Sequence, residues 1–129
     1  PEEEKAVQIL ASWEHLDKWQ KRRHEIADYY NTQFKDKIEV RPRPVYSEWN
    51  AHKYAIIVEN KFEAYKTMLA DGVETEQHFA KLQWTPNTDH EFPMTDKFVK
   101  QSLTIPNNPF MTDSEVEEVS RKVVANLQK

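Results

Sequence analysis

The stretch Tyr54-Ala-Ile-Ile-Val-Glu-Asn-Lys-Phe-Glu-Ala-Tyr-Lys-Thr-Met-Leu-Ala-Asp-Gly72 decides how the middle of this chain folds. Its first five residues are the most apolar run of the sequence and predict a central strand. Asn60 is a good N-cap and Glu63 follows three residues later, which predicts a helix over 61–71. Gly72, the sole glycine of the chain, stands where a helix ends most easily on a left-handed residue.

The same patterns extend outward to both ends. Apolar residues at mostly three- and four-residue steps predict one long helix over 2–34, and a T-x-x-E capping box at Thr112 predicts a final helix. The other expected elements are strands at 38–41, 73–79 and 102–105 and a short helix at 94–100. This order predicts a single α+β domain over residues 1–129, with a small, mostly antiparallel sheet covered by helices and a long N-terminal helix.

The apolar stripes also predict which helix faces are buried. Residues 20–34 are expected to pack on the sheet, and the basic cluster 21–23 within them is expected to be solvated. About 50 Å of helix, at 1.5 Å per residue, is long for this chain, so its first part projects or needs a partner. The expected stripes are Ala6, Ile9, Leu10, Trp13 and Leu16 on the first helix, Phe62, Tyr65, Met68 and Leu69 on the second, and Val116, Val119, Val123 and Leu127 on the last.

Composition excludes several classes of protein. The net charge is −4 with acids and bases interspersed, which argues against a nucleic-acid-binding face. No apolar run approaches the roughly 18 residues of a membrane span, so we expect no membrane partner and a cytoplasmic location. The absence of cysteine excludes a disulfide framework and a thiol nucleophile. A single glycine excludes the glycine-rich loops that hold phosphate groups.

The residues alone offer no complete catalytic constellation. Five histidines are present, and none pair at the spacing of a helical metal site, so no metal is expected. His15 and His24 are expected on the solvated side of the first helix. His52 and His78 are expected at strand ends, where they either pack and hydrogen-bond structurally or line a pocket. The lysines stand in polar contexts, whereas a lysine nucleophile needs a desolvated pocket.

Three regions together carry a family pattern. Residues 13–30, with Leu-Asp, Arg-Arg and a closing tyrosine, are similar to the long helix of the DegT/DnrJ/EryC1/StrS sugar aminotransferases. His52-Lys-Tyr-Ala-Ile56 resembles that family's H-L-Y-x-I strand, and Gly72-Val-Glu-Thr-Glu-Gln-His-Phe79 resembles its G-I-x-T-x-x-H-Y segment. Phe92-Pro93 and Ser102-Leu-Thr-Ile-Pro-Asn-Asn-Pro-Phe-Met-Thr112 resemble its F-P and L-S-L-P-x-x-P-x-M-T ending.

The resemblance implies the C-terminal small domain of a fold type I enzyme that transfers an amino group to a nucleotide-linked keto sugar in amino-sugar biosynthesis. Pyridoxal 5'-phosphate is then the cofactor of the full-length enzyme. Its lysine would lie in a large domain preceding Pro1, so this chain would hold no cofactor and no catalytic residue and would be inactive alone. The expected partners are that large domain, in the same or a separate chain, a nucleotide-sugar substrate, and a second copy in a homodimer.

The family's G-I-x-T-x-x-H-Y segment lies near the active-site cleft, which implies a substrate-binding role for His78 and Phe79. Ala80 stands where the family often has proline, and Leu82, Gln83 and Trp84 stand where a further histidine often follows. The sequence therefore departs from the family pattern at positions that bear on sugar recognition. The alternative from another class is a stand-alone, non-catalytic binding or interaction module that keeps the small-domain fold.

Overall fold

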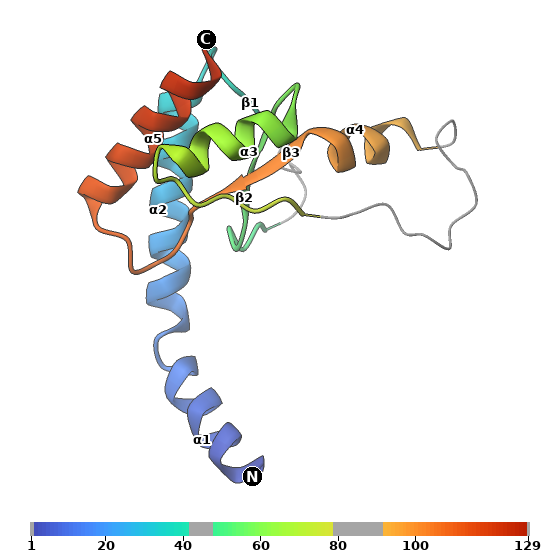
Figure 1. The fold of residues 1–129 in the computed structure, drawn as a ribbon. Helices are drawn as coiled ribbons and strands as arrows, with labels where there is room; N and C mark the ends of the chain where they lie inside the picture. Colours follow the sequence, from blue (N-terminus) through green and yellow to red (C-terminus); the bar gives the residue numbers. More distant parts are fainter. Residues whose placement is uncertain (1, 42–47, 79–91, 129) are drawn as a thin grey trace.

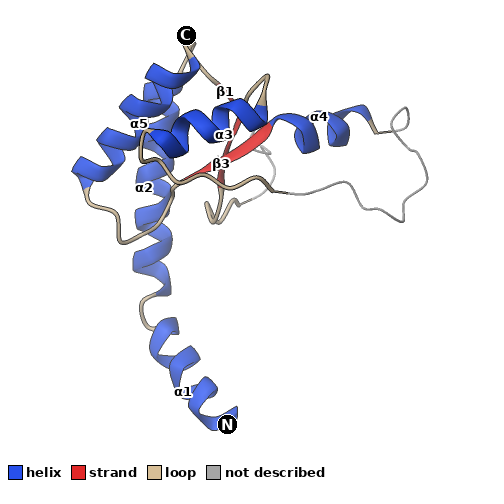
Figure 2. Cartoon of the chain, in the orientation of Figure 1, coloured by secondary structure: helices blue, strands red, loops and turns tan. Residues whose placement is uncertain are grey.

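The computed structural model describes residues 2–41, 48–78 and 92–128 as an α+β fold (Figures 1 and 2). Three strands form one sheet in the order β1-β2-β3, and both neighbouring pairs are antiparallel. The predicted fold class is thereby confirmed. In chain order the elements are α1 (Glu2–Trp13), α2 (Leu16–Phe34), β1 (Glu39–Val40), β2 (Tyr54–Ile57), α3 (Lys61–Ala70), α4 (Pro93–Gln101), β3 (Ser102–Ile105) and α5 (Asp113–Leu127).

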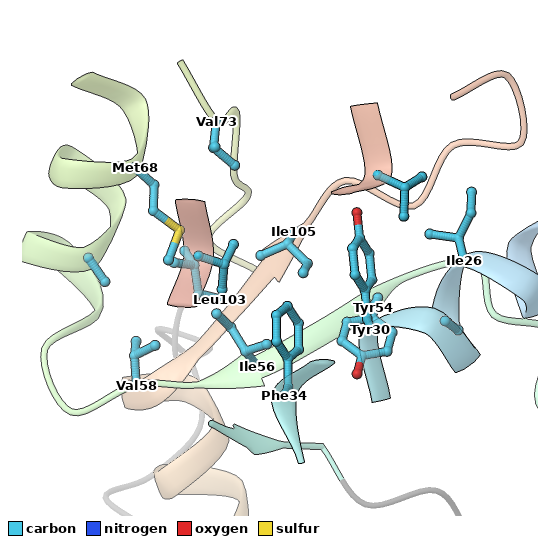
Figure 3. Packing of buried hydrophobic residues seen from close by; sticks show 14 of the residues in the cluster. Ile26, Tyr30, Phe34, Tyr54, Ile56, Val58, Met68, Val73, Leu103 and Ile105 are labelled. Atoms are coloured by element: carbon cyan, nitrogen blue, oxygen red, sulfur yellow. The ribbon is translucent and has the colours of Figure 1, made fainter. Parts of the chain in front are cut away.

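One face of the sheet carries the core. Tyr54 pairs with Ile105, and Ile56 pairs with Leu103, so these four side chains point to the same side of the sheet. Helices α2, α3 and α5 cover that face, and Figure 3 shows Met68 and Val73 reaching it beside Leu103. The fully buried side chains of the core include Ile26, Tyr30, Phe34, Ile56, Met68, Val73, Leu103, Ile105 and Val123.

The second half of α2 is fixed to this core by aromatic contacts. The ring of Tyr30 stacks on Phe34 at 5.4 Å between centroids and meets Tyr54 edge-on at 5.2 Å. The Tyr30 hydroxyl donates to the Pro106 carbonyl over 2.9 Å, so its polar end is satisfied inside the core. Burial raises the pKa of Tyr30 well above that of an ordinary tyrosine. Residues 20–34 thus pack on the sheet as predicted.

The prediction of one uninterrupted helix over 2–34 is wrong. A turn at Glu14 and His15 separates α1 from α2. The Ser12 hydroxyl donates to the Gln8 carbonyl over 2.8 Å, an i−4 bond that bends helices. The bond from the Glu14 amide to Leu10 is stretched to 3.4 Å, and the His15 amide turns to the carbonyl of Ser12 instead. α1 therefore extends from the rest of the chain at its own angle (Figure 1).

The predicted strand over 73–79 is also wrong within the described residues. Its contact with the sheet is an isolated bridge, in which Glu76 and Thr104 exchange two backbone hydrogen bonds of 2.9 Å. The start of the segment caps the C-terminus of α3, because the Val73 amide donates to the Met68 carbonyl over 2.8 Å. Phe79 lies outside the described residues.

Helix α3 has the predicted ends and a different buried face. The Asn60 side chain accepts from the Glu63 amide, and Gly72 adopts φ +77° as predicted. Ala64 and Met68 are buried, whereas Phe62 is 57% exposed and lies under the Lys66 ammonium at 4.3 Å. Leu69, half exposed, likewise faces away from the core. α3 packs against β3 and α5, and the buried side chains at this contact are the small Ala64 and the flexible Met68.

The final helix has the predicted capping box. Thr112 accepts from the Glu115 amide, and the Glu115 carboxylate accepts from the Thr112 amide over 2.7 Å. Val116 and Val123 are buried, and Val119 and Leu127 are partly buried against the core. Across residues 2–41, 48–78 and 92–128, no helix combines the length and apolar character needed to cross a bilayer.

Candidate functional site

A cleft of about 490 Å³ lies between α2 and three other segments. These segments are residues 52–53 before β2, residues 74–76, and residues 104–110 at the end of β3 and after it. Its aromatic wall is formed by Trp19 and Phe110, whose rings meet edge-on at 5.6 Å. Charged and amide side chains line the remainder, and the 104–110 segment forms the floor. The lining residues are Trp19, Arg23, His52, Lys53, Glu74, Glu76, Thr104, Ile105, Pro106, Asn107, Asn108, Pro109 and Phe110.

Glu76 is the centre of a charged group at one side of the cleft. The Lys53 ammonium donates to its carboxylate, and the His78 ring lies 2.7 Å from the same oxygen. The bond from Lys53, followed by the contact with His78, holds the pKa of Glu76 below its ordinary value. Its backbone is held by the bridge to Thr104. The carboxylate is therefore kept charged at neutral pH and at a fixed position on the cleft wall.

The predicted site residue His78 lies beside this cleft and contacts it through Glu76. Its side chain is 30% exposed, so it is neither buried in the core nor fully solvated. The structure is compatible with both interpretations of His78 given by the sequence, because the contact with Glu76 orients the ring without enclosing it. The other predicted site residue, Phe79, lies outside the described residues.

Two groups on the cleft have unused hydrogen-bonding capacity within the described part of the chain. The Arg23 guanidinium makes no hydrogen bond or ion pair there, and its Nε is buried. Asn107 is 8% exposed; its Nδ2 donates to the Ala51 carbonyl over 2.6 Å, and its buried Oδ1 has no donor. Buried polar groups are normally paired. Both residues line the cleft, and the two unpaired atoms themselves, Arg23 Nε and Asn107 Oδ1, are buried.

The basic cluster and one histidine depart from the solvated positions expected of them. Arg22 donates to the Met111 carbonyl over 2.9 Å and to Asp113 over 2.7 Å, which ties α2 to the start of α5. Its bond to Asp113 raises its pKa. The His24 ring stacks on Trp49, with its Nε2 2.7 Å from the Trp49 carbonyl. Tertiary contacts with these distant segments explain both differences.

The other two histidines of the described residues, His15 and His52, are both exposed. His15 is exposed as expected, 5.7 Å from the Trp19 ring, and His52 is exposed at the cleft. Among the residues that the structure describes, no three His, Asp or Glu side chains are grouped so as to hold a metal ion.

The cleft residues do not fit pyridoxal phosphate as a resident covalent cofactor. The lysine on its wall, Lys53, is an ammonium paired with Glu76, and its side chain is 43% exposed. A lysine that attacks a carbonyl must instead be desolvated and neutral. Lys53 is paired with a carboxylate and partly exposed, so it lacks the desolvated setting that such a lysine needs.

The sequence matches the family model of the DegT/DnrJ/EryC1/StrS aminotransferase family over residues 2–124. The chain belongs to this family. DesV of S. venezuelae has a similar fold, with a TM-score of 0.86 and 20% identity over 96% of this chain and 36% of that one. The aminotransferase TlmJ from Streptoalloteichus hindustanus gives a TM-score of 0.78 and 23% identity, covering 91% of this chain and 34% of that one.

A third similar structure is a DegT DnrJ EryC1 StrS aminotransferase from Brucella abortus, with a TM-score of 0.78, 18% identity and coverage of 93% and 34%. The chain thus spans about a third of the length of these structures, and the likeness confirms the fold. The comparison with curated proteins gives no match.

The family motifs meet at the cleft. Every lining residue falls in one of four stretches that carry the resemblance, namely 13–30, 52–56, 72–79 and 102–112. Reasoning from single residues missed Trp19, Arg23 and Asn107, because each looks ordinary in its own segment. The signal that could have identified these three residues is their membership of stretches that carry the same family resemblance.

Proposed function

We propose that this chain is the small domain of a pyridoxal-phosphate-dependent aminotransferase that acts on a nucleotide-linked keto sugar. In this proposal it supplies part of the sugar pocket and the contacts with the large domain, and the cofactor and its lysine belong to the large domain. The single observation that carries the proposal is that the family motifs, far apart in sequence, converge on one cleft.

The composition of the cleft supports a binding role. Trp19 and Phe110 offer an aromatic surface of the kind that packs against a sugar ring or a neighbouring domain. The Arg23 side chain lines the cleft, and its guanidinium can supply N–H donors to hydroxyl groups. Phe110 is 71% exposed and lies against Trp19, so the two rings form an exposed aromatic patch of the kind found at contact surfaces.

The role proposed for His78 is to contact the sugar from the edge of the cleft. Its contact with Glu76 fixes the ring, and the ion pair of Glu76 with Lys53 keeps that carboxylate in place. In the assembled enzyme such a residue affects substrate binding and turnover. It contributes little to folding, because its side chain is not buried in the core.

The test is to combine the chain with a lysine-bearing large domain of the family encoded in the same genome, in one polypeptide or as two chains. Amino transfer from glutamate to a nucleotide-linked keto sugar is then measured. We expect turnover to require residues 1–129, and His78→Ala to raise KM for the sugar several-fold while leaving the thermal midpoint within about a degree.

Lys100→Ala is the control, because it removes an exposed polar side chain of α4 outside the lining of the cleft. It should change neither KM nor the thermal midpoint. Turnover by the large domain alone would contradict the proposal. If His78→Ala instead lowers the free energy of unfolding by more than about 1 kcal/mol, its role is structural, as for a lost buried hydrogen bond.

A further inference from the structure

Asn107 holds the segment before β2 in an uncommon backbone conformation. Ala51 is fully buried and has φ +49°, in the left-handed region that residues with a side chain rarely adopt. Its carbonyl accepts a hydrogen bond of 2.6 Å from the Nδ2 of the buried Asn107. A sparsely populated conformation persists only where its surroundings fix it, so this bond is part of what keeps Ala51 in place.

Two side chains of α2 bind the two preceding carbonyls in the same way. The Gln20 Nε2 donates to the Asn50 carbonyl. The His24 Nε2 lies 2.7 Å from the Trp49 carbonyl, and because a carbonyl only accepts, this ring nitrogen carries a proton. Three consecutive carbonyls, at positions 49, 50 and 51, are thus each bound by a side chain from a distant segment. We call these three side chains, Gln20, His24 and Asn107, the carbonyl clamp.

The carbonyl clamp joins three of the segments that line the cleft. Gln20 and His24 lie outside the lining, and each directly follows a lining residue of α2. The carbonyls that they bind belong to the residues just before His52 and Lys53, which line the cleft. Asn107 is itself a lining residue, in the segment after β3. The clamp therefore fixes the positions of these three segments relative to one another.

The segment that contains Asn107 also holds the partner of Lys53. Glu76 accepts from the Lys53 ammonium through its carboxylate, and it is bound to Thr104 through its backbone. Thr104 and Asn107 belong to one short segment, which thus fixes Glu76 directly and the chain before Lys53 through Ala51. A partly exposed ion pair is maintained only where its two side chains are kept in place, because water competes for both charges. The geometry of this pair therefore depends on the clamp.

We propose that the carbonyl clamp is a positioning device of the cleft, which holds Lys53 against Glu76 by fixing the three carbonyls before His52. When one of its bonds is lost, Ala51 relaxes from the left-handed region and the chain that carries His52 and Lys53 shifts. Glu76 then loses its fixed ammonium, although no group in contact with its carboxylate has been changed. The inference goes beyond the proposed function, since it concerns the shape and charge of the cleft whatever the cleft binds.

The experiment is an NMR titration of the Glu76 carboxyl in residues 1–129. The bond from Lys53 is the main cause of the lowered pKa of Glu76. His24→Leu and Asn107→Ala should therefore each raise this pKa toward its ordinary value. His24→Gln should keep the wild-type pKa, because it retains a side-chain N–H donor that can reach the same carbonyl.

Amide hydrogen exchange at His52 provides a second readout, because this amide donates to the Asn50 side chain over 3.1 Å. Its exchange should become at least about tenfold faster in His24→Leu and Asn107→Ala, as for a locally opened segment. Tyr30→Phe is the matched control. It removes a bond of the same kind, from a side chain of α2 to the Pro106 carbonyl, and leaves the carbonyls of residues 49–51 bound. It should change neither readout.

Circular dichroism shows which variants are folded. If Asn107→Ala does not fold, His24→Leu and Gln20→Ala carry the test, since neither of these side chains belongs to the buried core. A wild-type pKa of Glu76 in the folded clamp variants overturns the proposal. An equal rise of that pKa in Tyr30→Phe also overturns it, because any loss of stability in this region would then disturb the ion pair.

Discussion

Helix α1 and the second half of α2 have similar apolar periodicity and opposite burial. In α2, Ile26, Tyr30 and Phe34 are at most 1% exposed, whereas the apolar residues of α1 are exposed by about two thirds. The periodicity of a helix therefore indicates that one face is made for burial. It does not indicate whether the covering surface lies in the same chain.

The difference follows from what lies within reach of each helix. Tyr30 and its neighbour Asn31 are joined to Pro106 and Tyr54 by hydrogen bonds of 2.9 and 2.7 Å, so the sheet covers this part of α2. Helix α1 extends beyond the sheet and the other helices (Figure 1). Residues 2–41, 48–78 and 92–128 bury none of its side chains.

The largest expected effect is a difference in stability between side-chain truncations on α2 and on α1. Tyr30→Ala removes a fully buried aromatic ring and should lower the free energy of unfolding by about 3–5 kcal/mol. Trp13→Ala should change it by less than about 0.5 kcal/mol, as for an exposed side chain. Urea unfolding at a concentration where the chain is monomeric measures both. Equal losses would show that α1 is part of the same cooperative core.

A smaller effect is expected where α2 meets α5. Arg22→Met removes the bonds to Met111 and Asp113 and should lower the free energy of unfolding by about 1 kcal/mol, since Asp113 is largely exposed. Lys21→Met is the control, because Lys21 is an exposed neighbour on the same helix. Thermal unfolding of both variants tests whether α2 is fixed by a specific contact. An equal change in both variants would show that the loss of one positive charge, and not the contact with α5, causes the effect.

The smallest effect concerns the charged side of the cleft, which like α1 is exposed. Because the pKa of Glu76 is lowered, its ion pair stabilises the fold above the unfolded-state pKa of about 4.3, and this contribution is lost as the pH falls. Lys53→Met should raise the pKa of Glu76 and weaken that acid dependence by a few tenths of a kcal/mol. An NMR titration of the Glu76 carboxyl measures the pKa, and an unchanged value would show that Lys53 does not hold it.

Local signals predicted most of the fold. The bounds of β3 and the caps of α3 and α5 depend on residues adjacent in sequence, and they were predicted correctly. The break at Glu14 and the single bridge at Glu76 depend on competing backbone hydrogen bonds, which apolar periodicity does not report. Apolar periodicity also misplaced the buried face of α3, because that face is set by the packing of α3 against β3 and α5.

The candidate site was predictable only in part. The family resemblance implied a site role for His78, and the structure shows its ring next to Glu76, a residue of the cleft wall. The cleft itself is built from side chains brought together by tertiary packing, as when Asn107 reaches Ala51. No single segment of the sequence carries that information. The role of His78 in substrate binding stays a prediction.

The most direct test of the account is whether residues 1–129 can bind the cofactor covalently. The purified chain is mixed with stoichiometric pyridoxal phosphate, treated with borohydride and analysed by mass spectrometry. We predict no stoichiometric adduct on any lysine, because Lys53 is ion-paired at the cleft and the proposed function assigns the cofactor lysine to a large domain. Selective, stoichiometric labelling of one lysine, with an absorption band near the visible edge before reduction, would contradict the account.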